Sequence, residues 1–417
     1  MIMQPYDMKE IEERVILVGV QESFSEDIEE SLDELAELCE TAGATVVGRV
    51  IQNREKIHPG TYIGKGKMDE VALLTEELDA TGIVCDDELS PAQLNNLEKE
   101  LGCKVMDRTL VILDIFAGRA NTSEGNIQVE LAQLRYRAAR LVGLRSSLSR
   151  LGGGIGTRGP GEKKLEMDRR LIHARISQLK AELAQVQKHR ELIRGKRKKD
   201  NLVVAAIVGY TNAGKSTLLN TLTDAGVLEE DKLFATLDPT TRMLELSAGQ
   251  NILLTDTVGF IRKLPHHLIE AFKSTLEEAK YADIILHVVD ASNPQKEKQM
   301  HVVYETLSQL GVTDKKVITL FNKQDKITEP EVLKDMKADK TLRISAKTGD
   351  GLDELKRELE NILRERSILL ERIFPYEKAG LIQLVRTKGQ LLEEDYRADG
   401  IYVKAFVPVE IYGKVAY

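Results

Sequence analysis

The first third of the chain alternates short apolar runs with segments whose apolar residues have helical spacing. The apolar runs have the length and composition of buried strands, and they lie at 14–20, 44–51, 82–85 and 104–106. The helical segments lie between or after them, at 26–42, 68–79, 91–101 and 109–116. Strands that alternate with helices predict a parallel sheet covered by helices.

Two longer helical stripes follow. The first is formed by Ile127, Leu131, Leu134, Ala138 and Leu141, and the second by Ile172, Ile176, Leu179, Leu183, Val186 and Ile193. The tract L-G-G-G-I-G-T-R-G-P-G-E at 151–162 separates them and suits neither a helix nor a strand. We therefore expect an antiparallel helical hairpin, whose second helix is about 45 Å long at about 1.5 Å per residue.

The hairpin segment carries a concentrated positive charge. Residues 135–200 include 19 Lys and Arg and six Asp and Glu, a net charge of +13, whereas the whole chain has −8 and the remainder therefore −21. Charge segregation of this size indicates a contact with a phosphate backbone. Three arginines around the glycine-rich tract, Arg145, Arg150 and Arg158, favour an RNA-binding tip. A solvated basic arm is the alternative.

The end of the chain predicts a small α+β unit. From residue 373 it indicates a strand, a helix at 376–387, and a hairpin that turns at Asp399 and Gly400. After that turn, apolar residues alternate with polar ones at Ile401, Val403, Ala405 and Val407.

Composition narrows the class of protein. The chain has 417 residues, 42% of them hydrophobic and 30% charged, so we expect about three units of ordinary domain size in a soluble protein. No apolar stretch approaches the roughly 18 residues that span a bilayer, and the start lacks a secretory pattern, so we expect a cytoplasmic location. Cys39, Cys85 and Cys103 are far apart, which predicts buried thiols and no disulfide framework or metal site.

The motif G-Y-T-N-A-G-K-S follows an apolar strand at 202–208 and opens a helix. Glycines at both ends let backbone N–H groups point at phosphate oxygens, a lysine supplies positive charge to the β- and γ-phosphates, and a serine hydroxyl suits Mg²⁺. The motif residues are Gly209, Tyr210, Thr211, Asn212, Ala213, Gly214, Lys215 and Ser216.

Three further motifs follow in the order that a guanine-nucleotide site requires. They are D-T-V-G (Asp256, Thr257, Val258, Gly259), N-K-Q-D (Asn322, Lys323, Gln324, Asp325) and S-A-K (Ser345, Ala346, Lys347). Asp256 would hold Mg²⁺ through its water shell, and Gly259 lets a backbone N–H approach the γ-phosphate. Asp325 can accept two hydrogen bonds from the guanine N1–H and amine, which adenine cannot offer.

In these motifs the chain resembles the translation-factor-related GTPases and, within them, the HflX family. The likeness covers nearly the whole chain, and it includes T-Y-I-G-K-G-K at 61–67, the glycine-rich tract, the phosphate loop and F-A-T-L-D-P-T-T-R at 234–242. The resemblance implies a ribosome-associated GTPase that binds the large subunit and, in some members, separates stalled or idle ribosomes under stress. We expect GTP or GDP and ribosomal RNA as partners, and a monomer off the ribosome.

The resemblance also implies a mobile switch formed by Phe234, Ala235, Thr236, Leu237 and Asp238. Its threonine completes the metal sphere, and we assign Thr236, although spacing alone leaves Thr240 and Thr241 open. The expected catalytic residues are then Lys215, Thr236 and Gly259, and the Mg²⁺ ligands are Ser216 and Thr236. Similar loops in related GTPases imply K⁺ as a second cofactor, beside Asn212.

Phe260 occupies the position where many GTPases carry a water-orienting glutamine. A phenyl ring makes no such hydrogen bond, so we expect slow hydrolysis by the protein alone and stimulation by ribosomes. One alternative is a ribosome- or RNA-binding module with a structural, slowly hydrolysed nucleotide. Another is an ATPase that acts on RNA through Lys65 and Lys67.

The expected architecture is α/β and contains four parts. An N-terminal α/β domain (1–120) is followed by a basic helical hairpin (121–200), a P-loop GTPase domain (201–366) and a small C-terminal α+β domain (367–417).

Overall fold

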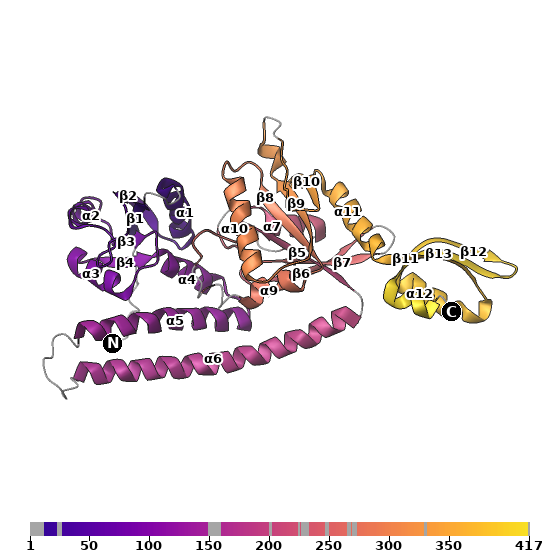
Figure 1. Ribbon diagram of the computed structural model, residues 1–417, viewed down its shortest axis with the longest axis horizontal. Helices are drawn as coiled ribbons and strands as arrows, with labels where there is room; N and C mark the ends of the chain where they lie inside the picture. The colour runs from indigo at the N-terminus through magenta and orange to yellow at the C-terminus, as the bar shows by residue number, and fades with distance from the viewer. Residues whose placement is uncertain are drawn as a thin grey trace, which may run out of the picture. The chain divides into compact units, whose positions relative to one another are not determined.

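The computed structural model describes residues 12–22, 27–148, 160–199, 202–223, 226, 233–246, 250–264, 268, 273–328 and 332–415. The chain divides into two compact units (Figure 1). The first unit comprises Met1–Val186, Asp231–Leu237 and Lys263–Phe272. The second comprises Gln187–Glu230, Asp238–Arg262 and Lys273–Tyr417.

The first unit contains a four-stranded parallel sheet in the order β2-β1-β3-β4. Its strands are β1 (Arg14–Glu22), β2 (Thr45–Arg54), β3 (Gly82–Cys85) and β4 (Lys104–Asp107). The helices are α1 (Ile28–Thr41), α2 (Lys65–Glu77), α3 (Pro91–Leu101) and α4 (Arg108–Arg119). Helices α1 and α4 cover one face, and α2 and α3 cover the other. The alternation of strands and helices expected from the sequence is confirmed.

Local signals explain where these helices begin and end. Ser90 caps α3 by accepting a hydrogen bond from the Gln93 N–H, and the Ser90 N–H in turn donates one to the side-chain oxygen of Gln93. Gly102 ends α3 in the left-handed region. Asp107 caps α4. Helix α2 begins at Lys65, three residues before the expected start, and the Lys67 ammonium pairs with Glu70 at 2.8 Å.

The expected hairpin helices are α5 (Ser123–Leu148) and α6 (Pro160–Lys199). Leu131 of α5 packs with Ile176 and Leu179 of α6 in a shared apolar cluster. Partly buried neighbours extend it: Ile127, Leu134, Ala138, Ile172 and Leu183. The Arg175 guanidinium donates to both oxygens of Glu130, at 2.7 and 2.9 Å.

Two expectations about this hairpin were wrong: the length of the second helix, and the non-helical character of residues 160–162 at the end of the glycine-rich tract. Helix α6 has 40 residues, so its length is about 60 Å rather than 45 Å. It is longer because Pro160 and the two residues after it already belong to the helix, where a proline needs no N–H partner in the first turn, and because the basic run 194–199 stays helical. The tract 151–159, with Arg150 and Arg158, lies outside the described residues.

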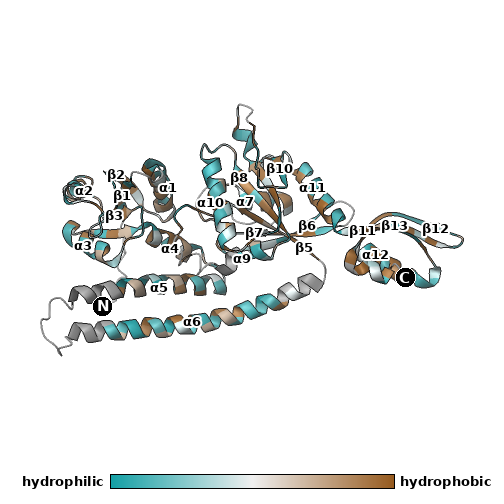
Figure 2. Ribbon diagram, in the orientation of Figure 1, coloured by the Kyte–Doolittle hydropathy of each residue, from teal (hydrophilic) through white to brown (hydrophobic). Residues whose placement is uncertain are grey.

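The second unit contains a six-stranded sheet in the order β10-β9-β8-β5-β7-β6, with β6 antiparallel to β7 and the other pairs parallel. Its strands are β5 (Val203–Gly209), β6 (Thr240–Glu245), β7 (Asn251–Asp256), β8 (Ile284–Asp290), β9 (Lys316–Asn322) and β10 (Lys340–Arg343). Helices α7 (Lys215–Thr223) and α11 (Leu352–Glu365) share the main core with this sheet, and α9 (Lys273–Tyr281) and α10 (Lys296–Gln309) accompany it. Figure 2 shows apolar residues concentrated on the central strands, whereas α6 is largely hydrophilic.

The end of the chain forms an antiparallel three-stranded sheet, β11-β13-β12. Its elements are β11 (Ser367–Phe374), α12 (Ala379–Lys388), β12 (Gln390–Arg397), β13 (Gly400–Pro408) and α13 (Val409–Val415). The hairpin and the apolar alternation through Val403 and Val407 are confirmed, since both residues are buried in one core. The expected helix at 376–387 begins instead with a 3₁₀ turn, Tyr376–Lys378.

The three cysteines are free, and two of them are buried as expected. Burial raises the pKa of the Cys39 thiol to about 12, which keeps it protonated. Cys103 is only half-buried, so the expectation was wrong there. Across the described residues, no helix has both the length and the apolar character needed to cross a membrane.

Candidate functional site

The phosphate loop connects β5 to α7 and depends on two glycines that no other residue could replace. Gly209 has φ of 156°, and a Cβ there would lie 2.2 Å from the Val288 carbonyl oxygen. Gly214 has φ of 93°, and a Cβ there would lie 2.3 Å from the side-chain nitrogen of Asn322. Asn212 also has a positive φ, of 57°. The backbone therefore adopts the tight turn that directs N–H groups at a phosphate.

Lys215 is the first residue of α7, and it is 7% exposed. Its ammonium donates a hydrogen bond of 2.7 Å to the carbonyl oxygen of Tyr210, in the same loop. Burial lowers the pKa of Lys215 to about 8, with a further lowering from Lys323, while Asp256 acts in the opposite direction. A desolvated cation held against the loop gains strongly from a phosphate anion, because no water screens their attraction.

Ser216 and Asp256 bring two oxygen donors together. The Ser216 hydroxyl donates a hydrogen bond of 2.8 Å to Oδ2 of Asp256, at the end of β7. Hydroxyl and carboxylate oxygens are the hard ligands that Mg²⁺ prefers. These residues therefore fit a magnesium ion shared with a bound nucleotide.

The guanine-recognition motifs are tied to the phosphate loop through Asn322. Its side-chain N–H donates to the carbonyl oxygen of Ala213 at 2.9 Å, and its side-chain oxygen accepts from the Ala346 N–H at 2.8 Å. Asp325 accepts a hydrogen bond of 2.6 Å from the Ser345 hydroxyl. One amide side chain thus joins its own segment to Ala213, which is 109 residues away in the sequence, and to Ala346, which is 24 residues away.

Electrostatic contacts also affect the charged side chains of the N-K-Q-D motif. The hydrogen bond from Ser345 lowers the pKa of the Asp325 carboxyl, so the group stays ionised as an acceptor. Lys323 adopts φ of 62°, and its ammonium lies 2.8 Å from a carboxylate oxygen of Asp290.

The segment from Asp256 to Phe260 runs along the phosphate loop. The Thr211 N–H donates to the Phe260 carbonyl at 2.8 Å, and the Phe260 N–H donates to the Gly209 carbonyl at 3.1 Å. A Cβ on Gly259 would lie 2.9 Å from the Lys215 ammonium, so only glycine leaves the loop intact. The Phe260 side chain is buried, with 2% of its surface exposed. Its ring has no group that could orient a water molecule by a hydrogen bond.

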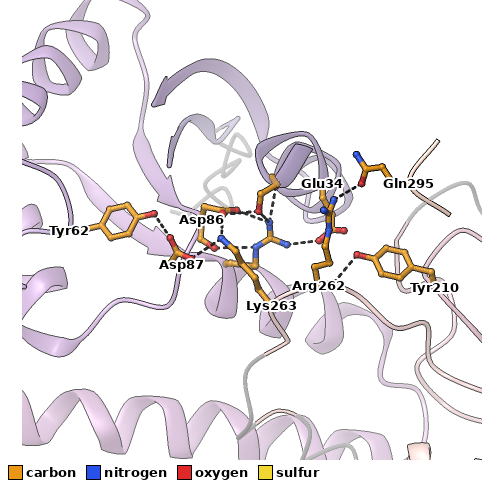
Figure 3. Close-up of polar contacts among 10 residues, drawn as sticks. Glu34, Tyr62, Asp86, Asp87, Tyr210, Arg262, Lys263 and Gln295 are labelled. Atoms are coloured by element: carbon orange, nitrogen blue, oxygen red, sulfur yellow. Dashed lines mark hydrogen bonds and ion pairs between the residues drawn. The ribbon is translucent and has the colours of Figure 1, made fainter. Parts of the chain in front are cut away.

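Sequence reasoning missed a role for Tyr210. Its hydroxyl accepts a hydrogen bond of 2.8 Å from the Arg262 N–H, and the Arg262 guanidinium donates to Gln295 at 2.8 Å (Figure 3). A tyrosine inside a glycine-rich loop is the only sequence signal for this contact, and it does not name the partner.

The switch residues belong to different units. Phe234, Ala235, Thr236 and Leu237 lie in the first unit, whereas Asp238 lies in the second. The ring of Phe234 packs edge-on against that of Phe116, with centroids 4.7 Å apart.

The two competing threonines, Thr240 and Thr241, begin β6. Thr240 pairs with Asp256 in the strand ladder, and the hydroxyls of Thr241 and Thr255 lie 3.0 Å apart.

A second polar cluster, not anticipated from the sequence, lies in the first unit (Figure 3). Buried Arg108 donates hydrogen bonds of 2.6 Å to both Asp86 and Glu34. The Lys263 ammonium contacts Asp86 and also lies 2.8 Å from Asp87. Burial alone would raise the pKa of Asp86, but Arg108 and Lys263 together lower it. Adjacent aspartates directly after a buried strand were the signal that could have indicated this cluster.

A mainly parallel sheet with this phosphate loop, a serine–aspartate pair whose oxygens fit magnesium, and the N-K-Q-D and S-A-K motifs joined to the loop have the arrangement of a P-loop GTPase. Comparison with known proteins agrees. The chain matches sequence-family profiles described as "GTP-binding GTPase N-terminal" over residues 29–117, "GTP-binding GTPase Middle Region" over 119–197 and "50S ribosome-binding GTPase" over 204–323. It belongs to the HflX family of GTPases and hydrolyses GTP.

The alignments with similar proteins cover nearly the full length of this chain. A GTPase HflX of Lacrimispora saccharolytica is 70% identical over 410 residues, which cover 98% of this chain and 97% of that protein. The GTPase HflX of Escherichia coli K12 is 40% identical over 398 residues, with 94% and 93% covered. Among solved structures, an SsGBP complex with GDP is 24% identical, with a TM-score of 0.48 and coverage of 84% of this chain and 98% of that one.

Proposed function

We propose that this GTPase is a molecular switch that binds the large ribosomal subunit and dissociates or rescues ribosomes under stress. The observation that carries the nucleotide part is the Asp325 carboxylate, kept ionised beside Ser345 and linked to the phosphate loop through Asn322. The ribosomal part is supported by the profile described as a 50S ribosome-binding GTPase and by the charge of +13 on residues 135–200. The four-part division of the chain and a cytoplasmic location belong to the same proposal.

In the proposed cycle, Lys215 and the loop N–H groups hold the β- and γ-phosphates. Ser216 and Thr236 would hold Mg²⁺, with Asp256 acting through water, and the ion would neutralise phosphate charge. The Gly259 N–H senses the γ-phosphate. The remaining residues of the four motifs and of the 234–238 switch shape the pocket, and Asn212 holds K⁺. Equal turnover in sodium and potassium buffers would count against the K⁺ site.

The catalytic part of the proposal is tested by measuring single-turnover GTP hydrolysis with and without purified large ribosomal subunits. Because Phe260 cannot orient water, we expect slow hydrolysis alone and clear stimulation by the subunit. An unchanged rate would favour the alternative supported by Phe260, a ribosome-binding module whose nucleotide is mainly structural.

Ribosome attachment is tested by co-sedimentation with separated subunits in GTP, GDP and a non-hydrolysable analogue. We expect binding to the large subunit that depends on the nucleotide and falls steeply with salt, because phosphate contacts release counterions. Binding that ignores salt and nucleotide would contradict the proposal.

A further inference from the structure

The second unit contains a cavity of about 270 Å³ whose lining includes no residue of the nucleotide motifs. It lies between α10 and the segment 332–337, and we name it the α10 pocket. Its apolar lining comes from Met300 and Tyr304 of α10, Phe321 of β9, and Leu333. A cavity of this size is smaller than most cofactor sites and matches one large side chain.

A buried hydrogen-bond network holds the segment that forms one wall of the pocket. Asp335, 6% exposed, accepts hydrogen bonds of 2.6 Å from the hydroxyls of Tyr304 and Thr319. It also accepts one of 2.9 Å from the Lys337 N–H. Burial alone would raise the pKa of Asp335, but contacts from His287, Thr319 and Tyr304 outweigh it and lower the pKa. The carboxylate therefore stays charged and anchors the wall to the sheet.

This anchoring leaves two apolar side chains facing water at the mouth of the pocket. Val332 is 91% exposed and Met336 is 81% exposed, the two highest values among the large apolar residues that the structure describes. Asp335 lies between them in the sequence and is held by its hydrogen bonds. The segment therefore keeps both apolar side chains exposed. Exposed apolar residues beside a preformed apolar cavity are typical of a protein interaction site.

The charges around the mouth are mainly positive. Lys296, Lys334 and Lys337 line it, with Glu297 as the acidic neighbour, since Asp335 is already satisfied. The Lys337 ammonium lies 4.9 Å from the centre of the Tyr304 ring, so it also frames the cavity. This positive rim belongs to a part of the chain that is otherwise strongly acidic, because the residues outside 135–200 sum to −21.

We propose that the α10 pocket binds an acidic segment of a partner protein, which inserts one aromatic or long aliphatic side chain into the cavity. The apolar cavity takes the anchor, Val332 and Met336 cover its flanks, and the lysines pair with its carboxylates. A nucleic acid would satisfy the lysines but would leave the apolar cavity and the two exposed side chains without a partner.

The test uses the full chain with GDP as the target for a phage library of random short peptides. We expect enrichment of peptides in which acidic residues flank one aromatic or aliphatic residue. The best peptide is then labelled, and its affinity is measured by fluorescence anisotropy. The charge variant Lys334→Glu/Lys337→Glu and the apolar variant Val332→Ser/Met336→Ser should each weaken binding by about tenfold or more.

Both variants change exposed residues, so the fold is preserved, and unchanged GDP affinity confirms it. The matched controls are Lys414→Glu, an exposed lysine of α13, and Leu73→Ser, which is 68% exposed on α2. They should leave peptide binding unchanged. Enriched peptides that are not acidic, or whose binding ignores both pocket variants, would overturn the proposal. Displacement of the peptide by a single-stranded RNA that depends on the lysines and not on Met336 would overturn it in favour of nucleic acid.

Discussion

At the scale of single residues, the fold changes the pKa of two groups of the proposed nucleotide site. Burial lowers the pKa of Lys215, and the Ser345 hydroxyl lowers the pKa of Asp325. The first residue is therefore poised to gain from a phosphate anion, and the second remains a carboxylate for a base. Each change leads to a measurable expectation.

Nucleotide affinity should depend on pH through Lys215. Its pKa is about 8 without ligand and rises when a phosphate lies beside it, so binding takes up a proton above that pH. Affinity for GDP should be full below about pH 7 and fall by up to roughly tenfold per unit above about pH 8. Calorimetry in buffers of different ionisation enthalpy measures the uptake, and Lys356→Ala on α11 should behave as the unmodified chain. Binding without proton uptake at about pH 8.5 would contradict this.

Asp325→Asn should change base preference. An amide replaces the acceptor for the guanine N1–H and amine, so GTP affinity should fall by at least about a hundredfold, because two hydrogen bonds to a charged group are worth about 3–6 kcal/mol. Xanthosine triphosphate should gain affinity, because it carries a carbonyl where guanine carries the amine, and the new amide can donate to it. Competition against a fluorescent GDP analogue measures both. Asp353→Asn, in the first turn of α11, is the matched control, and equal losses in the two variants would contradict a role in base recognition.

At the scale of elements, buried ion pairs connect helices and strand ends of the first unit that are far apart in the sequence. Arg108 at the start of α4 joins Asp86, which follows β3, to Glu34 of α1. Lys263 adds a contact from a segment 177 residues away in the sequence. Because both carboxylates are buried, removal of their partner leaves charge in a medium of low dielectric constant.

Arg108→Leu should therefore lower the free energy of unfolding by about 3–5 kcal/mol, as measured by urea denaturation. Arg49→Leu, which removes an exposed pair with Asp33, should cost no more than about 1 kcal/mol. Since the pKa of Asp86 is lowered in the folded protein, its contribution is present above its unfolded pKa of about 4 and is lost as the pH falls through the lower folded value. Equal effects of the two substitutions would show that the network does not stabilise the unit.

At the scale of the whole molecule, charge is distributed unevenly between the hairpin and the rest of the chain. Exposed lysines of α6, such as Lys180 and Lys188, contribute to this asymmetry. If the hairpin contacts ribosomal phosphates, its charges set both the affinity and the salt dependence of attachment.

Lys180→Glu/Lys188→Glu should weaken co-sedimentation with the large subunit and reduce the slope of log affinity against log salt by about two. GTP affinity should not change, because neither lysine belongs to the nucleotide motifs. Lys356→Glu/Lys414→Glu carries the same change of charge elsewhere in the chain. A loss of binding equal to that of the hairpin variant would indicate a general effect of net charge.

The nucleotide motifs and most of the helices and strands could be predicted from the sequence alone. The phosphate loop, Asp256, Asn322 and Asp325 could be predicted because each requirement is local: a glycine where φ is positive, a hydroxyl next to a lysine, a carboxylate after a strand. The four strands of the first sheet, and β5 of the second, were likewise predicted from runs of apolar residues.

Which distant residues meet could be seen only in the folded protein. The contact of Asn322 with Ala213, the burial of Arg108 between two acids, the pairing of Lys263 with Asp86 and the walls of the α10 pocket all join segments that no local pattern relates. The physical reason is that packing and burial, which depend on the whole fold, decide these neighbours. Periodicity and turn chemistry act over only a few residues.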